Sequence, residues 1–183
     1  FTADLGVRGN INRIISYDAG VFGLFYNDRI GLMQKALDDG RVVQERRNAG
    51  DARILGIESL LDFNLKKLFN ISNDFDFNYF VNTSFIQSEY VRSDIPGLIN
   101  NKVEFVPDLN LKTGVRFGYK NFSSNIQYTY LSEQFTDTSN SVDGGLSGVN
   151  GLIPAYDVLD FSSSFKYKYF KLEAGINNAL DNS

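Results

Sequence analysis

The side chains that could carry chemistry in this sequence are carboxylates, amines, guanidinium groups and hydroxyls, because its 183 residues include no histidine and no cysteine. Histidine is the usual general base and the commonest metal ligand, and cysteine provides thiolate sites and disulfides. The carboxylates that remain are not grouped as an acid and base pair, and no nucleophile stands beside a base. The sequence therefore predicts no enzyme, with no catalytic residues, no cofactor and no metal site.

Four arginines form the one cluster of basic residues: Arg41, Arg46, Arg47 and Arg53. Grouped positive charge could attract an anionic ligand. A solvated strand end explains the same residues without a ligand and is the preferred interpretation. The net charge of −4 argues against nucleic acid as a partner, because its binding needs clustered basic residues.

Two loop sequences have features of ion-binding or phosphate-binding loops. The acidic turns at residues 38–40 (DDG) and 143–145 (DGG) could suggest calcium, but turn chemistry explains them and the ligand spacing of a calcium loop is missing. No lysine follows the series Gly145, Gly148 and Gly151, which argues against a phosphate-binding loop. We expect ordinary loops at both places.

The stretch that organises the rest of the chain is residues 74–88, DFDFNYFVNTSFIQS. Side chains alternate between the two faces of a strand, and here they separate an apolar face from a polar one, with only Phe80 and Ile86 as large apolar residues on the polar side. At ~3.3 Å per residue the stretch would span roughly 50 Å, about two to three times an ordinary strand. Such a strand suits a sheet that stands between lipid and water.

The same alternation predicts seven further strands, which gives eight in all. They cover residues 3–9, 14–27, 41–67 (with a bulge near Gly50), 109–119, 122–130, 159–167 and 170–177. Short connections fall near 10–13, 70–73, 120–121 and 168–169, and long loops near 28–40, 90–103 and 136–155. Tight turns at one end and long loops at the other are typical of outer-membrane barrels.

Aromatic residues gather at the short-turn end, as in the girdle of a membrane barrel. They are Phe69, Phe75, Tyr119, Phe122, Tyr167, Tyr169 and Phe170. The three prolines lie on the long-loop side, outside strand interiors, where a missing N–H costs no ladder bond. No run of ~18 apolar residues is present, so a transmembrane helix is not expected.

Five segments, in this order, resemble the C-terminal part of TonB-dependent outer-membrane receptors, nearest to the ferric-citrate and siderophore type. Each is a short piece of a strand or of the approach to one. They are 5–9 (LGVRG, like "ELGxRG"), 47–58 (like "xNxGxAxxxGxE"), 106–107 (like "NVPxH"), 153–160 (like "xPxYxxxD") and 175–182 (like "GxxNLFDxxY"). The sequence departs from the pattern at Asp108-Leu109, where the family has a polar or histidine pair, and at Ala179-Leu180, where it has Leu-Phe.

The resemblance implies an all-β fold, an antiparallel up-and-down transmembrane β-barrel of 22 strands plugged by an N-terminal domain. On that basis residues 1–183 are a C-terminal portion with eight strands, without the plug, the early strands and the last strand. It also implies a receptor and transporter in the bacterial outer membrane, surrounded by lipid. The ligand would be a ferric chelate, iron citrate or a siderophore, and TonB would energise transport through the missing N-terminal part. Ligand contacts in this family come from variable loops and the plug, so no binding residue is named.

On this interpretation one face of the sheet meets lipid, and its expected members are Phe75, Phe77, Tyr79, Leu111, Val115, Phe117, Tyr128 and Phe161. The charged residues Glu58, Asp62 and Arg116 belong to the other face, where they could line the lumen or simply form a salt-bridged wall, which we prefer. Two alternatives remain. A small closed outer-membrane barrel would have a structural or adhesive role. A soluble carbohydrate-binding β-sandwich would bury Phe77, Tyr128 and Phe161.

Overall fold

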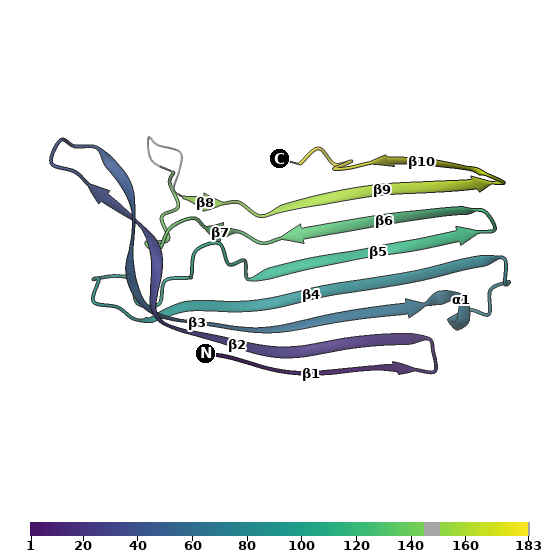
Figure 1. Cartoon of the computed structure of the whole chain (residues 1–183), viewed down its shortest axis with the longest axis horizontal. Coiled ribbons are helices and arrows are strands. Elements are labelled where there is room, and N and C mark those ends of the chain that lie inside the picture. The colour runs from purple at the N-terminus through teal and green to yellow at the C-terminus, as the bar shows by residue number, and fades with distance from the viewer. Residues whose placement is uncertain (145–150, 183) are drawn as a thin grey trace.

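The chain forms one broad, single-layered antiparallel sheet in a computed structural model that describes residues 1–144 and 151–182 (Figure 1). Eight strands follow one another in up-and-down order, β1-β2-β3-β4-β5-β6-β9-β10, and β7 pairs with β8 in a separate small sheet. The elements of the described residues are β1 (Thr2–Ile11), β2 (Ile15–Ala36), β3 (Val42–Asn64), α1 (Leu65–Leu68), β4 (Phe75–Arg92), β5 (Leu109–Tyr119), β6 (Phe122–Leu131), β7 (Gln134–Phe135), β8 (Leu152–Ile153), β9 (Tyr156–Tyr167) and β10 (Phe170–Ile176).

The predicted all-β, antiparallel up-and-down fold is confirmed, and so are the eight long strands. The predicted bulge near Gly50 is also present, as a shift of register between Asp51 and Ala52 in the pairing of β3 with β4. Short connections and long loops lie at opposite ends of the sheet (Figure 1). The three prolines lie between strands, at the loop end.

The prediction of a long loop at 28–40 is wrong, because β2 and β3 continue beyond the other strands as a paired hairpin. Register shifts at Tyr26 and Arg29 interrupt the ladder, which then resumes from Ile30 to Ala36. The turn closes at Gly40, whose φ is 81° and whose N–H donates to the carbonyl of Leu37 at 2.9 Å. This extension is held by backbone hydrogen bonds between β2 and β3, and its sequence lacks the alternation that marks the other strands.

Two further predictions need correction at the connections. The strand predicted for 41–67 ends at Asn64, whose side-chain oxygen accepts from the N–H of Lys67 at 2.9 Å and caps α1. A capping side chain satisfies a free helical N–H and so favours a turn of helix here. The connection to β4 is therefore longer than the tight turn expected at 70–73. The loop predicted at 136–155 is bounded by the short pair β7 and β8.

The residues expected to face lipid share one face of the sheet. Partners in an antiparallel ladder lie on the same side, and Phe77 pairs with Phe117 while Tyr79 pairs with Val115. Val21, Ile57 and Phe85 are neighbours across three strands on this side of the sheet, and each is 49–57% exposed. We call this side the apolar face and the opposite side the polar face. An apolar face this large is not covered by any described part of the chain.

The apolar residues on the polar face fill the space above glycines. A Cβ added at Gly114 would lie 2.8 Å from the ring of Phe80, and one added at Gly56 would overlap the ring of Phe22. The aromatic rings therefore occupy the space that a side chain would fill at the neighbouring glycine, which accounts for Phe80 as an exception to the alternation. Ile86 packs against the buried cluster at the loop end.

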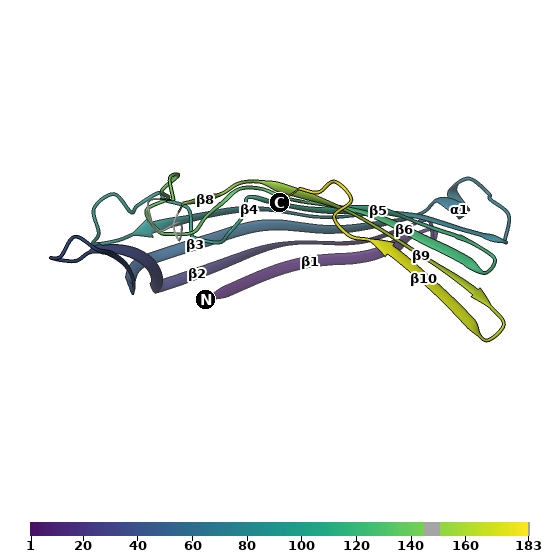
Figure 2. The same ribbon diagram turned by 90° about the horizontal axis from the view of Figure 1, so that it is seen from above.

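Neither alternative architecture matches the sheet. β1 and β10 are its two edges, so the eight strands do not close into a small barrel. Figure 2 shows a single curved layer, with the β9–β10 hairpin swung to one side at the short-turn end. Phe161 is 37% exposed and Phe77 and Tyr128 are partly exposed, whereas a sandwich would bury all three. No helix within the described residues has the length and apolar character needed to span a membrane.

Candidate functional site

The buried core of the described residues lies at the loop end of the sheet. It is formed where the β2–β3 hairpin, residues 93–108 and residues 132–144 pack together, and we call this body the loop cluster. Its buried apolar residues are Ala49, Ala52, Ile54, Tyr90, Leu98 and Val103. The loops at this end are therefore folded against one another.

Residues 93–108 run beside the upper part of β4, where β5 no longer pairs with it. The ladder between β4 and β5 ends at Phe85 and Leu109. Beyond it, Tyr90 exchanges backbone hydrogen bonds of 2.9 Å with Asn100 and Asn101. The N–H of Val103 donates to the hydroxyl of Ser88 at 3.2 Å. The loop satisfies the backbone groups that the end of β5 leaves unpaired, as buried backbone requires.

A buried carboxylate holds this loop to two strands. Glu104 is only 5% exposed, and its oxygens accept from the Tyr90 hydroxyl at 2.8 Å and from a guanidinium nitrogen of Arg29 at 3.3 Å. Burial and the neighbouring carboxylate raise the pKa of Tyr90, so its hydroxyl stays protonated and donates. Burial opposes the charge of Arg29, but the hydrogen bond with Tyr90 and the charge of Glu104 outweigh it and raise its pKa. The Nε of Arg29 is buried without a partner among the described residues.

Residues 132–144 are joined to the same body by hydrogen bonds. The hydroxyl and the N–H of Thr138 both donate to the carbonyl of Leu32 at 3.1 Å. The side chain of Asn140 accepts from Lys102 N–H at 2.6 Å and donates to its carbonyl at 2.9 Å. Gly31 is required at this contact, because a Cβ there would overlap the Thr138 methyl group. The hairpin and both loops therefore form one connected unit.

Asp137 is a second buried carboxylate, 1% exposed, and its partners are local. It accepts from the N–H of Ser139 at 2.9 Å and from the hydroxyls of Ser139 and Ser141. This is the turn chemistry expected of an Asp followed by serines. The DTSNS sequence carried that signal, whereas nothing in the sequence around Glu104 indicated that it would be buried.

A groove of about 560 Å³ lies between the hairpin and the two loops. Lys35 and Glu45 in its wall form an ion pair of 3.6 Å. Arg47 also lines the groove, is exposed, and has no ion-pair partner among residues 1–144 and 151–182. Other lining residues include Met33, Leu98, Thr138, Ser139 and Ser141. The groove therefore presents one guanidinium that lacks an ion pair among the described residues, beside apolar and polar walls.

The structure does not bring the four predicted arginines together. Arg41 pairs with Asp39 at 2.7 Å in the hairpin turn, and Arg53 pairs with Glu89. Arg46 and Arg47 are successive residues of β3 and so point to opposite faces. The preferred interpretation, a solvated strand end, is supported for the cluster as a whole, and only Arg47 lines the groove.

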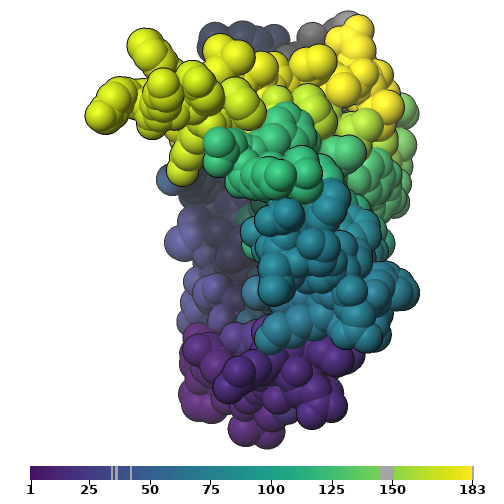
Figure 3. All heavy atoms as spheres, turned by 90° about the vertical axis from the view of Figure 1, so that its right-hand side faces the viewer, coloured from purple at the N-terminus to yellow at the C-terminus, as the bar shows by residue number. Residues whose placement is uncertain are grey.

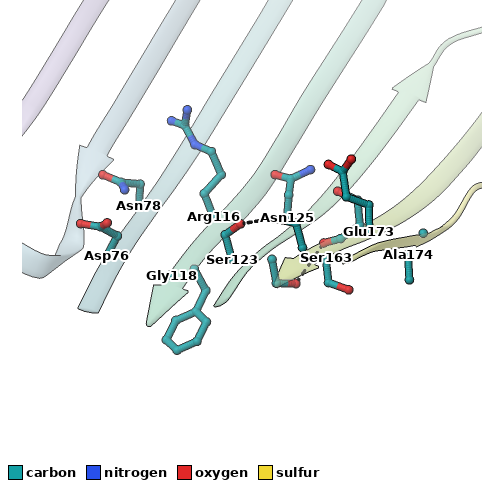
Figure 4. Close-up of a pocket in the computed structure, with 14 residues that line it drawn as sticks. Asp76, Asn78, Arg116, Gly118, Ser123, Asn125, Ser163, Glu173 and Ala174 are labelled. Carbon is teal, nitrogen blue, oxygen red and sulfur yellow. Dashed lines mark hydrogen bonds between the residues drawn. The ribbon is translucent and has the colours of Figure 1, made fainter. Parts of the chain in front are cut away.

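The polar face carries a charged wall near the short-turn end, with a depression that Figure 4 shows in close-up. Arg116 forms an ion pair with Asp62 and lies over the ring of Phe80 at 5.3 Å. These contacts confirm the salt-bridged wall for Asp62 and Arg116, whereas Glu58 has no ion pair in the described part of the chain. Asp76, Asn78, Asn125 and Glu173 also line the depression.

The acidic turn at residues 38–40 shows no feature of a calcium site. Asp39 accepts from the N–H of Arg41 at 3.1 Å, as in an ordinary turn. The turn at 143–145 ends outside the described residues, as do Gly145 and Gly148 of the glycine series. Among the residues that the structure does describe, no group of acidic side chains is arranged to hold a metal ion.

Comparison with known proteins gives one family and several solved structures. The model of the family described as "TonB dependent receptor-like, beta-barrel" matches residues 1–179. A search of curated protein sequences finds no match. The fold is similar to the ferric citrate transporter FecA in its unliganded form, with 21% identity, a TM-score of 0.78, and coverage of 98% of this chain and 26% of that chain.

Two further structures with the same fold have different cargoes in their names. The copper transporter OprC is 16% identical to this chain, with a TM-score of 0.71. The match covers 98% of this chain and 25% of that chain. The ferric yersiniabactin uptake receptor FyuA from Yersinia pestis is 18% identical with a TM-score of 0.69, covering 98% and 24%. The chain thus spans about a quarter of the length of the structures it matches. At such identities the likeness shows the fold.

Proposed function

The chain belongs to the TonB-dependent receptor β-barrel family, and we propose that it forms a C-terminal part of the barrel wall of an outer-membrane receptor that takes up a ferric chelate. The family consists of transport receptors, not enzymes, and sits in the bacterial outer membrane. We place the short turns on the periplasmic side and the loop cluster outside the cell. The plug and the remaining strands of a 22-stranded barrel would come from the rest of the receptor.

The proposal rests on the difference between the two faces of the sheet and between its two ends. One face is apolar over the part of the sheet between the short turns and the loop cluster, and no described part of the chain covers it, as contact with lipid requires. The opposite face carries ion pairs and serine and asparagine side chains, which suit a water-filled or plugged lumen. The loops at one end are folded into a body with a groove. At the other end three connections are short turns, and the fourth, between β3 and β4, contains the helical turn α1.

The fold does not identify the ligand, because transporters with different cargoes share it. The groove of the loop cluster has the unpaired guanidinium of Arg47 next to the ion pair of Lys35 and Glu45. A guanidinium presents paired donors that match a carboxylate. We therefore propose an anionic ferric chelate with carboxylate groups, such as ferric citrate, as the ligand class. Transport would be energised through TonB.

Binding by the purified full-length receptor tests this assignment. Calorimetry with ferric citrate and with an uncharged hydroxamate chelate is expected to show preference for the citrate complex. Arg47→Gln is expected to weaken citrate binding by about tenfold or more, since hydrogen bonds to charged groups contribute ~1.5–3 kcal/mol. Arg46→Gln removes the same charge from the opposite face of β3 and is expected to leave binding unchanged. Equal loss in both variants, or a preference for the uncharged chelate, would contradict the proposed ligand class.

A further inference from the structure

Two turns at the short-turn end repeat one four-residue pattern. They are residues 119–122 (YKNF), between β5 and β6, and residues 167–170 (YKYF), between β9 and β10. In each, the first and last aromatic residues are cross-strand partners on the apolar face. In each, the lysine amine lies over the preceding tyrosine ring, at 5.2 Å for Lys120 and 5.4 Å for Lys168. The two turns therefore present the same arrangement of a cation above an aromatic pair.

The backbone at both lysines is unusual for this residue type. Lys120 has a φ of 50° and Lys168 a φ of 52°, in the left-handed region that glycine and asparagine occupy more readily. Neither lysine forms an ion pair within the described residues. A strained position held by a functional group is reason to ask what that group binds.

The nearby carboxylates leave these two positive charges largely uncompensated. Asp76 pairs with Lys66 at 3.5 Å, and Glu173 pairs with Lys171 at 2.5 Å. Asp74 acts on Lys120 electrostatically but forms no ion pair with it. The tips of both turns are therefore basic.

The two turns also lie side by side. Phe122 pairs with Phe165 across β6 and β9, and the N–H of Lys166 donates to the carbonyl of Asn121 at 3.0 Å. Figure 3 looks onto this end and shows the green and yellow-green turns next to each other, with the latter projecting. The aromatic residues around the lysines are open to the surroundings, and Tyr169 is 99% exposed. Together the two turns form a continuous rim of aromatic rings capped by two cations, which we call the Tyr-Lys rim.

We infer that the Tyr-Lys rim binds the phosphate of anionic phospholipids in the periplasmic leaflet of the outer membrane. The exposed rings continue the apolar face and suit the boundary between acyl chains and headgroups. The lysines at the turn tips then lie at the depth of the phosphates, where each attracts an anionic lipid. Continuity with the apolar face favours a lipid over free phosphate. The inference rests on the proposed membrane placement and adds a lipid site to it.

Native mass spectrometry of the full-length receptor, released from mixed detergent micelles, can test the inference. The micelles would contain phosphatidylglycerol and phosphatidylethanolamine in equal amounts. The wild-type receptor is expected to retain phosphatidylglycerol preferentially. The double variant Lys120→Gln/Lys168→Gln is expected to lose affinity for it by about fivefold per lysine. Lys112→Gln, which removes the same charge from the polar face of β5, serves as the matched control and is expected to behave as wild type.

Three outcomes would overturn the inference in distinguishable ways. Equal retention of phosphatidylglycerol by the wild-type and double-variant receptors would refute the lipid site but leave the membrane placement intact. Displacement of the lipid by millimolar inorganic phosphate would show a general phosphate site instead of a lipid site. A receptor that remains in aqueous solution without detergent and retains neither lipid would refute the membrane placement and, with it, the proposed function.

Discussion

The hydroxyl of Tyr90 donates a hydrogen bond of 2.8 Å to the carboxylate of Glu104, and both side chains are buried where the loops meet the sheet. Tyr90 belongs to the polar face of β4, and Glu104 belongs to the loop that returns beside it. Arg29 approaches the same carboxylate from β2. One buried carboxylate therefore ties together three segments that are far apart in the sequence.

Glu104→Ala is expected to loosen the loop cluster. The change leaves the Tyr90 hydroxyl and the Arg29 guanidinium without their shared partner, and breaking a buried pair in this way costs about 3 kcal/mol. Hydrogen exchange of the full-length receptor is expected to show faster exchange at the amides of Tyr90 and Asn100, which donate across the junction to the carbonyls of Asn101 and Tyr90. Glu133→Ala, at an exposed position of a neighbouring loop, is the control. Unchanged protection in the Glu104 variant would show that the carboxylate does not hold the loops.

Tyr90 is expected to resist ionisation at alkaline pH. Its pKa is raised by burial and by the charge of Glu104, so the protonated form is the one that the fold stabilises. That stabilisation is complete below the pKa of an unfolded tyrosine, ~10, and is lost as pH rises through the raised value in the folded protein. The measurement is the difference in phenolate absorbance between wild type and Tyr90→Phe. A difference that appears at the ordinary tyrosine pKa would contradict the prediction.

Phe22 and Gly56 are expected to be energetically coupled, because the ring occupies the space above the glycine. Gly56→Ala forces the ring out of this position and is expected to destabilise the folded receptor by about 1–3 kcal/mol. The double change Phe22→Ala/Gly56→Ala is expected to cost less than the sum of the two single changes. Gly6→Ala is the control, since a Cβ there would meet only ordinary contacts at 3.4 Å. Strict additivity in urea unfolding from lipid vesicles would refute the coupling.

Val115 is expected to face the hydrocarbon region. Val115→Arg is therefore expected to reduce the folding free energy in lipid by ~2–4 kcal/mol if the residue lies near the bilayer midplane. Gln127→Arg places the same side chain on the polar face, opposite Gly114, and is expected to cost much less. Refolding of the full-length receptor into vesicles measures both. A near-zero effect at Val115 would count against the assignment of the apolar face.

The strands between the two ends of the sheet could be predicted from the sequence because each residue there belongs either to the apolar face or to the polar face. β5 covers residues 109–119, as its alternation indicated. The ends of β2 and β4 in the loop cluster could not be predicted in the same way, because the strands there are held by backbone hydrogen bonds, which leave no pattern in side-chain type. The helical turn after Asn64 did leave a signal, the capping asparagine, which the strand pattern obscured.

Most residues of the candidate site could not be predicted from the sequence, for a different reason. Arg29 and Glu104 are 75 residues apart, and only the docking of the loop onto β4 brings them together. The arginine cluster could be recognised in the sequence as a group of like residues. Because side chains alternate along β3, however, Arg46 and Arg47 point to opposite faces. Which of them lines a groove depends on where residues 93–98 and 138–141 fold, and neither loop has a periodic pattern from which that could be derived.

Iron uptake by cells tests whether this receptor transports ferric citrate. The full-length receptor would be produced in cells that lack their own ferric citrate receptor, and accumulation of radiolabelled iron supplied as ferric citrate would be followed with and without TonB. Uptake is expected to require both the receptor and TonB and to fall when Arg47 is replaced by glutamine. Accumulation that is the same with and without the receptor would contradict transport of this ligand, and accumulation that persists without TonB would contradict the energised mechanism.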